Sequence, residues 1–167
     1  MSAAAAERFV RRLEKLGAAE RAALKAEAGR PPRPDVLAFD AFTAAFWRLS
    51  NSRLPRDACR LVAALYFWHP APGGRGDLGA ALGRAAGRGR VTRTERLLDQ
   101  LLAAPLSRLH GPLFEAVRRL SAARVPVDWP QLIVDLGRWD RPTTDEELSA
   151  QDAWANSWLK YGSEHAD

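Results

Sequence analysis

The chain has 167 residues, of which 47% are hydrophobic, and carries a net charge of +5. This length suits one domain and this composition supplies a buried core, so a disordered chain is excluded. A single cysteine excludes an internal disulfide. No apolar run reaches about eighteen residues, so no membrane span is expected. Charged residues at 7, 8, 11 and 12 interrupt the apolar start before a signal-peptide core can form, which predicts a cytoplasmic protein.

The charge is unevenly distributed along the chain. Residues 1–127 hold 22 Lys and Arg against 11 Asp and Glu, whereas residues 128–167 hold 3 against 9. Of the 25 basic residues, 22 are arginines, and a guanidinium group binds phosphate through two parallel hydrogen bonds. The basic part therefore indicates either a polyanionic partner or a solvated surface without a specific ligand.

Apolar residues recur at helical spacing along the first half of the chain, and strand alternation is nearly absent. The helices expected there, in chain order, cover about residues 3–16, 18–28, 36–49 and 55–68. Prolines at 31, 32 and 34 separate the second from the third, because proline cannot continue a helix. The third helix is expected to carry Phe39 and Phe42 on one face, and the fourth to bury Leu61, Leu65 and Trp68.

The second half is also predicted to be helical. The expected helices begin near Asp77, Thr92, Leu106, Asp128 and Thr144. The helix from about 106 to 123 contains Gly111-Pro112, which would kink it or split it in two. The clearest signal lies at Asp128 and Gln131, which have capping-box spacing and are followed by apolar residues on one helical face. We expect Trp129 to belong to that buried face.

These signals predict an all-α fold with eight or nine helices in a two-part bundle and no sheet. The chain is expected to form a single helical domain over residues 1–167. The proline- and glycine-rich stretches at 30–34 and 70–76 are the places where subdomains of about 1–70 and about 77–167 would divide.

Catalytic and metal-binding patterns are absent from the sequence. The histidines at 69, 110 and 165 are far apart, and His69 is interpreted as structural. Cys59 lies mid-helix and is interpreted as a small buried residue. Asp135 is expected to pair with Arg138 three residues later rather than to bind metal. We therefore predict no enzyme activity, no catalytic residue, no metal and no cofactor.

Basic residues at helical spacing form the candidate ligand surface. The residues selected on this ground are Arg21, Lys25, Arg84, Arg88, Arg93, Arg96, Arg118, Arg119 and Arg124. Such side chains would hold a nucleic-acid backbone without reading its sequence. The last three end a helix, where they would equally complement its dipole, so for them both interpretations stay open.

Several segments resemble, in order and spacing, CasB-type proteins, the small subunit of the type I-E CRISPR Cascade surveillance complex. They are GAAERAALK at 17–25, LYFWHP at 65–70 with LGAAL at 78–82, RTERLL at 93–98 with LLAA at 101–104, VPVDWPQL at 125–132 with Asp135, Leu136 and Trp139, and WANSW at 154–158. Together they span about residues 9 to 160, and the segment at 125–132 is the most specific.

The resemblance implies one CasB-like helical domain without catalytic activity, present as paired copies within the complex. It implies contact with the backbone subunits that hold the crRNA, with the large subunit, and with the target and displaced DNA strands. It implies binding that stabilises the R-loop without sequence preference. The family's basic surface carries over to Arg21, Lys25, Arg93 and Arg96. Two alternatives stay open: a free-standing helical DNA-binding regulator and a helical protein-interaction adaptor.

Overall fold

The computed structural model describes residues 3–31, 36–46, 54–86 and 91–164. Over these residues it contains helices, turns and loops but no strand, which confirms the predicted all-α class. The helices are α1 (Ala3–Leu13), α2 (Ala18–Lys25), α3 (Val36–Phe46), α4 (Arg56–Tyr66), α5 (Leu78–Ala85), α6 (Val91–Ala103), the short 3-10 helix η2 (Leu106–Arg108), α7 (His110–Ala122), α8 (Trp129–Gly137) and α9 (Ala150–Glu164).

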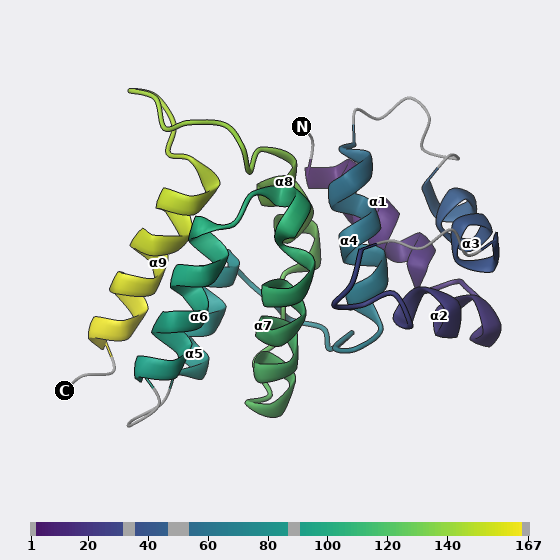
Figure 1. Cartoon of the computed structure of the whole chain (residues 1–167), viewed down its shortest axis with the longest axis horizontal. Helices are drawn as coiled ribbons and strands as arrows, with labels where there is room; N and C mark the ends of the chain where they lie inside the picture. The colour runs from purple at the N-terminus through teal and green to yellow at the C-terminus, as the bar shows by residue number, and fades with distance from the viewer. Residues whose placement is uncertain (1–2, 32–35, 47–53, 87–90, 165–167) are drawn as a thin grey trace.

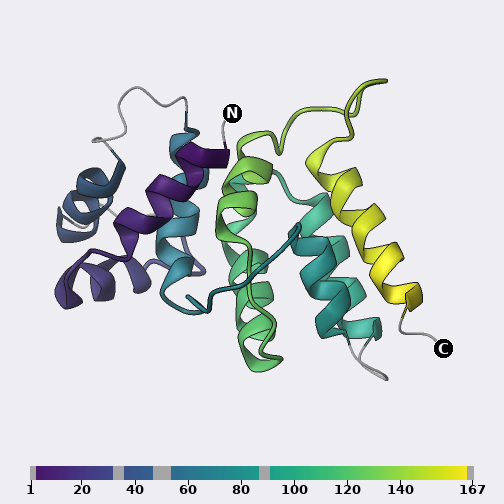
Figure 2. The same cartoon turned by 180° about the vertical axis from the view of Figure 1, so that it is seen from behind.

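The helices form two groups that share one core (Figures 1 and 2). Helices α1–α4 lie on one side and α5–α9 on the other, as the predicted two-part bundle requires. Helix α8 joins the groups because it packs against both α1 and α4, while α9 lies along α5. None of the helices described is long and apolar enough to cross a membrane.

Two helix starts follow the capping chemistry expected from the sequence. The Asp77 carboxylate accepts a hydrogen bond from the Ala80 backbone N–H at 2.9 Å, and the Asp128 carboxylate accepts one from the Gln131 N–H at 3.1 Å. Each bond satisfies an amide that has no partner within the first helical turn. Trp129, which follows the second cap, is 3% exposed, so its predicted place in the core is confirmed.

The predicted start of the last helix at Thr144 is wrong. The Thr144 hydroxyl does accept a hydrogen bond from the Glu147 N–H at 3.1 Å, but this bond closes an isolated turn. The helix begins six residues later, where the Ser149 hydroxyl accepts a bond from the Asp152 N–H at 3.0 Å. The same cap spacing occurs twice in this stretch, and only the second is followed by residues that pack on α5.

The segment predicted over 106–123 divides, which is one of the two outcomes foreseen. A 3-10 turn ends at Arg108, and α7 begins at His110. The division precedes Gly111-Pro112 and places Pro112 in the first turn of α7. Proline has no N–H to donate, and only in a first turn does a helix lose nothing by this.

The aromatic face expected on α3 is only partly buried. Phe42 is 1% exposed and packs edge-on against Phe9, with ring centroids 6.2 Å apart. Phe39 is 52% exposed, so the two rings that were expected on one face do not share an environment. The buried stripe of α3 runs through Ala38, Phe42 and Ala45, and Phe39 lies about 100° around the helix from Ala38.

Candidate nucleic-acid interface

An exposed tryptophan forms the centre of the candidate site. Trp68 is 39% exposed, so the prediction that it is buried on a helical face with Leu61 and Leu65 is wrong. The reason is that α4 ends at Tyr66. The Trp68 backbone N–H then donates to the Leu65 carbonyl at 3.0 Å in a tight turn. Beyond a helix end, helical spacing no longer decides where a side chain points.

One sequence-selected cation lies over this tryptophan, and a second lies over the aromatic ring packed against it. The Lys25 ammonium lies 4.5 Å from the centroid of the Trp68 ring. The Phe114 ring meets the indole at 67° with centroids 4.9 Å apart, and the Arg118 guanidinium lies 5.8 Å from the Phe114 centroid. Cations are attracted to aromatic faces, so the rings help to hold both charges at the surface. We call Lys25, Trp68, Phe114 and Arg118 the Trp68 cluster.

A glycine makes room for this cluster. Gly29 has φ +78°, in the left-handed region that residues with a side chain rarely adopt. A Cβ atom at this position would lie 2.5 Å from Cδ1 of Phe114. The segment after α2 therefore lies directly against Phe114 because residue 29 carries no side chain.

Arg21 lies near the cluster but is partly engaged within the fold. Its Nε donates to the Leu16 carbonyl at 2.7 Å, and a terminal nitrogen donates to the Glu14 carbonyl at 2.7 Å. Its guanidinium carbon is also 5.8 Å from the Phe67 ring centroid. Arg21 thus satisfies two carbonyls of the turn that follows α1, a role that the sequence pattern did not predict.

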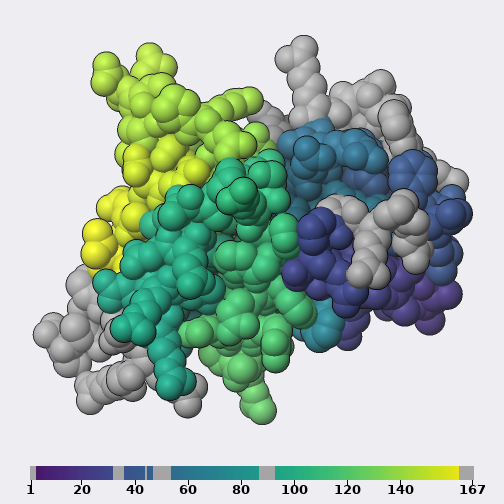
Figure 3. Space-filling view, in the orientation of Figure 1, coloured from purple at the N-terminus to yellow at the C-terminus, as the bar shows by residue number. Residues whose placement is uncertain are grey.

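A second group of basic residues lies where α6 begins and α7 ends. A short connection joins these helices as an antiparallel pair, so the start of one is beside the end of the other. Figure 3 shows α6 and α7 next to the α2 region on one face of the molecule. The sequence-selected residues at this end are Arg93, Arg96, Arg118, Arg119 and Arg124. We call them the α6–α7 basic end.

The members of the α6–α7 basic end differ in how free their charges are. Arg93 and Arg96 are exposed and make no ion pair or hydrogen bond through their side chains with the residues that the structure describes. Arg119 is 3.3 Å from the Glu115 carboxylate, which partly neutralises it. Arg124 is exposed and has φ 57°, the left-handed conformation that often ends a helix.

Besides Arg21, two other selected residues, Arg84 and Arg88, are not part of these groups. Arg84 donates to the Arg75 carbonyl at 2.9 Å and lies 4.5 Å from the Tyr161 ring centroid. It belongs to α5, which packs on α9 and lies behind α6 in Figure 1. Arg88 lies outside the described residues.

Cys59 and His69, the cysteine and the histidine considered for catalysis, are either buried or hydrogen-bonded within the fold. Burial raises the pKa of the Cys59 thiol to about 12, so the reactive thiolate is strongly disfavoured. The His69 Nε2 is hydrogen-bonded to the Val125 carbonyl at 2.7 Å, and the His69 carbonyl accepts from the Trp129 indole at 3.1 Å. The structural interpretations of Cys59 and His69 are thereby confirmed. In the described ranges no three His, Cys, Asp or Glu side chains converge on a point.

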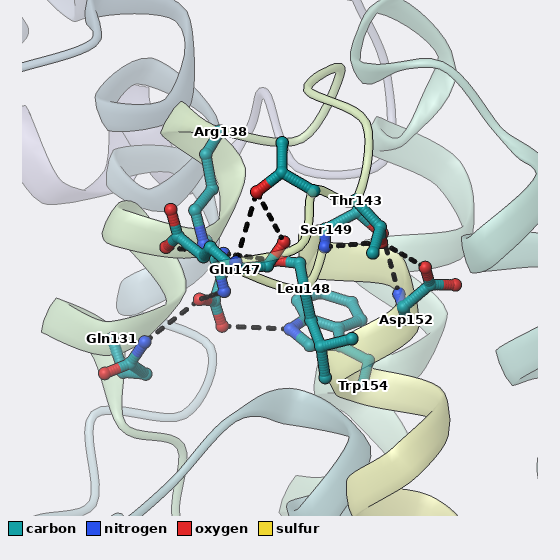
Figure 4. A network of polar contacts seen from close by, with 10 residues as sticks. Gln131, Arg138, Thr143, Glu147, Leu148, Ser149, Asp152 and Trp154 are labelled. Atoms are coloured by element: carbon teal, nitrogen blue, oxygen red, sulfur yellow. Dashed lines mark hydrogen bonds and ion pairs between the residues drawn. The ribbon is translucent and has the colours of Figure 1, made fainter.

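The acidic part of the chain forms a separate polar network (Figure 4). The Asp135 carboxylate accepts hydrogen bonds from the Trp154 indole and the Gln131 amide, each at 2.9 Å. Arg138 lies 3.7 Å from Asp135, the predicted pair, and 3.0 Å from Glu147. Burial raises the pKa of Asp135, and the two donors and Arg138 counteract part of that rise. The acidic side chains thus connect α8 to the start of α9 rather than lining the basic face.

Comparisons with known proteins agree with this helical arrangement. Residues 20–159 match the family described as CRISPR-associated protein Cse2. A Cse2-family CRISPR-associated protein from Thermus thermophilus is 28% identical, with a TM-score of 0.71 over 93% of this chain and 97% of that one. CasB from M. ruber gives a TM-score of 0.75 at 21% identity, over 96% of this chain and 95% of that one.

A chain of a CRISPR RNA-guided surveillance complex gives a TM-score of 0.70 at 24% identity, over 97% of this chain and 95% of that one. At 21% and 24% identity, the likenesses to M. ruber CasB and to the chain of the surveillance complex concern the fold alone. A comparison with curated protein sequences finds no match.

Proposed function

Because the chain belongs to the CRISPR-associated Cse2 family, we propose that it is a non-catalytic subunit of a Cascade-type CRISPR surveillance complex. Its partners are the backbone subunits that hold the crRNA, the large subunit and a second copy of itself. Within the complex it binds the backbone of the target and displaced DNA strands without sequence preference and stabilises the R-loop.

The observation that carries this proposal is the separation of charge in the folded chain. Lys25 and Arg118 belong to the Trp68 cluster, and Arg93 and Arg96 are exposed on α6 without an ion pair to any residue that the structure describes. The acidic side chains around Asp135 are engaged on α8 and at the start of α9. A surface of this kind attracts a phosphate backbone and carries no module that reads bases.

The energetic demand on such a subunit is small. Exchanging a DNA duplex for a guide–target heteroduplex is close to balanced, so a few kcal/mol of added backbone attraction decides whether the opened state persists. Several charge contacts along a displaced strand supply attraction of that size. Reading the sequence is left to base pairing with the guide.

The test measures how DNA binding depends on salt, for the full chain and for the assembled complex. Binding of a labelled single strand is followed between about 50 and 200 mM salt, where the log–log slope decreases by roughly 0.7 for each phosphate that the protein no longer neutralises. We expect Lys25→Ala with Arg118→Ala, and separately Arg93→Ala with Arg96→Ala, to flatten the slope. Arg141→Ala is the matched control, because Arg141 is exposed beside the acidic residues.

Arg124→Gly adds a variant in which loss of folding does not explain loss of binding. Glycine suits the left-handed backbone at this position, so the variant should be at least as stable as the wild type. Its binding should nonetheless weaken, because one cation is removed. Slopes that stay unchanged in all three basic variants would overturn the proposal of backbone binding.

A further inference from the structure

We propose that Trp68 is a base-stacking site for single-stranded nucleic acid and that the cations beside it hold the phosphates of the stacked nucleotide. This inference rests on the proposed function and deepens it, because it names a residue that contacts the unpaired bases of the bound strand. Backbone attraction alone does not distinguish a duplex from a single strand, whereas an exposed indole does.

The exposure of Trp68 sets it apart from the other tryptophans that the structure describes. Trp68 is 39% exposed, whereas Trp129, Trp139, Trp154 and Trp158 are between 0% and 8% exposed. An indole left in water forgoes a large hydrophobic stabilisation. It therefore offers that surface to a planar apolar partner, and every nucleobase has such a face.

The indole is held in one orientation before any ligand arrives. Its Nε1 donates to the Lys25 carbonyl at 3.1 Å, and the Phe114 ring packs against it at 67°. Phe114 is itself kept in place by the close approach of Gly29. A ring fixed in this way loses little conformational freedom when a base stacks on it, so more of the contact energy appears as affinity.

Charges of the correct sign surround the ring. The Lys25 ammonium lies over the indole on a flexible four-carbon stem, so a base can displace it and leave it within reach of the adjoining phosphate. Arg118 lies over Phe114 and makes no ion pair or side-chain hydrogen bond in the described part of the chain. Its guanidinium donors are therefore available to a second phosphate.

The other strongly exposed aromatic ring described lacks this setting. Phe39 is 52% exposed and lines a groove of about 600 Å³ between α3, α4 and the start of α7. The charged side chains that line the same groove are mixed in sign rather than all positive: Asp57, Asp140, Arg56 and Arg60. Phe39 is therefore a matched control for Trp68: it is an exposed aromatic ring whose charged neighbours include carboxylates.

The test compares two strands of equal length and charge: a thymidine oligonucleotide and a strand made only of abasic residues. The full-length protein is titrated against each at low salt by fluorescence anisotropy. The wild type should bind the thymidine strand roughly tenfold more tightly, the size expected for one stacked base. Trp68→Ala should abolish that preference, leaving affinity for the abasic strand and the salt slope unchanged. Trp68→Phe should keep part of the preference, and Phe39→Ala all of it.

The outcomes separate this inference from the function on which it rests. If the wild type binds both strands equally, or if Trp68→Ala retains the preference, the stacking site is refuted while backbone binding stands. If the wild type binds neither strand even at low salt, the proposed function itself fails. Thermal melting of Trp68→Ala shows whether its loss of preference reflects a damaged fold, and partial preference in a normally melting Trp68→Phe shows that an aromatic ring is what is needed.

Discussion

Two tryptophan clusters in this molecule place the same side chain in opposite surroundings. Trp139 and Trp154 meet at a centroid distance of 4.7 Å, are at most 1% exposed, and lie beside the Asp135 carboxylate, which accepts the Trp154 N–H. Trp68 meets Phe114 at 4.9 Å but lies on the surface beside Lys25, whose carbonyl accepts its N–H. Both indoles satisfy their polar atom, so hydrogen bonding does not distinguish them.

The clusters differ in what covers the rings and in the sign of the neighbouring charge. Trp154 lies on α9, which packs along α5, and its carboxylate partner is buried with it. Trp68 is covered in part by the Phe114 ring and by the flexible Lys25 side chain, and Arg118 lies over Phe114. The first cluster is therefore built for stability, and we expect the second to contribute mainly to binding.

The largest expected contrast is in unfolding energy. Trp154→Ala should lower the free energy of unfolding by about 3–5 kcal/mol, because it opens a cavity and leaves the buried Asp135 carboxylate without one of its donors. Trp68→Ala should lower it by about 1 kcal/mol or less, as for other surface positions. Urea denaturation of both variants measures the difference. Equal losses would mean that the Trp68 cluster belongs to the core.

A smaller effect tests how tightly the buried cluster is enclosed. A Cβ atom at Gly79 would lie 2.1 Å from the Trp154 carbonyl oxygen, which is backbone and cannot swing aside. Gly79→Ala should therefore separate α5 from α9 and reduce the free energy of unfolding by about 1–3 kcal/mol. Gly111→Ala is the control, since nothing lies within 4 Å of its Cβ position. It should be neutral or slightly stabilising.

The smallest expected effect concerns pH. Because burial raises the pKa of Asp135, the folded chain holds this proton to higher pH than the unfolded chain does. The stability that the protonated Asp135 contributes is thus complete below the ordinary carboxyl pKa. It is lost as the pH rises through the raised pKa of the folded chain. Asparagine does not titrate, so the stability lost in Asp135→Asn should be larger at about pH 4 than at about pH 7. A loss that grows with pH would contradict the raised pKa.

Local patterns predicted much of the helical framework. The caps at Asp77 and Asp128 could be predicted from the sequence because a cap depends on residues three positions apart. The burial of Trp129 followed from an apolar stripe on the same helix. The cap predicted at Thr144 forms its hydrogen bond but begins no helix. The helix begins after Ser149, where the following residues pack on α5.

The candidate site was predictable only in part. Lys25 and Arg118 were identified from charge and helical spacing, but nothing in the sequence indicated that one tryptophan would join them. Trp68 was assigned to the core because its helix was expected to continue two residues further than it does. Arg21 lies on α2 as expected, but part of its guanidinium is engaged by carbonyls just after the end of α1.

The sequence by itself determined the helical class, several helix ends and the division of the chain into a basic and an acidic part. Each of these depends on composition or on residues within one or two helical turns. The tertiary structure alone decided which tryptophan stays exposed and which cations surround it. Those contacts join α2, the segment after α4 and α7, and such pairings arise only when distant helices bury their apolar faces against one another.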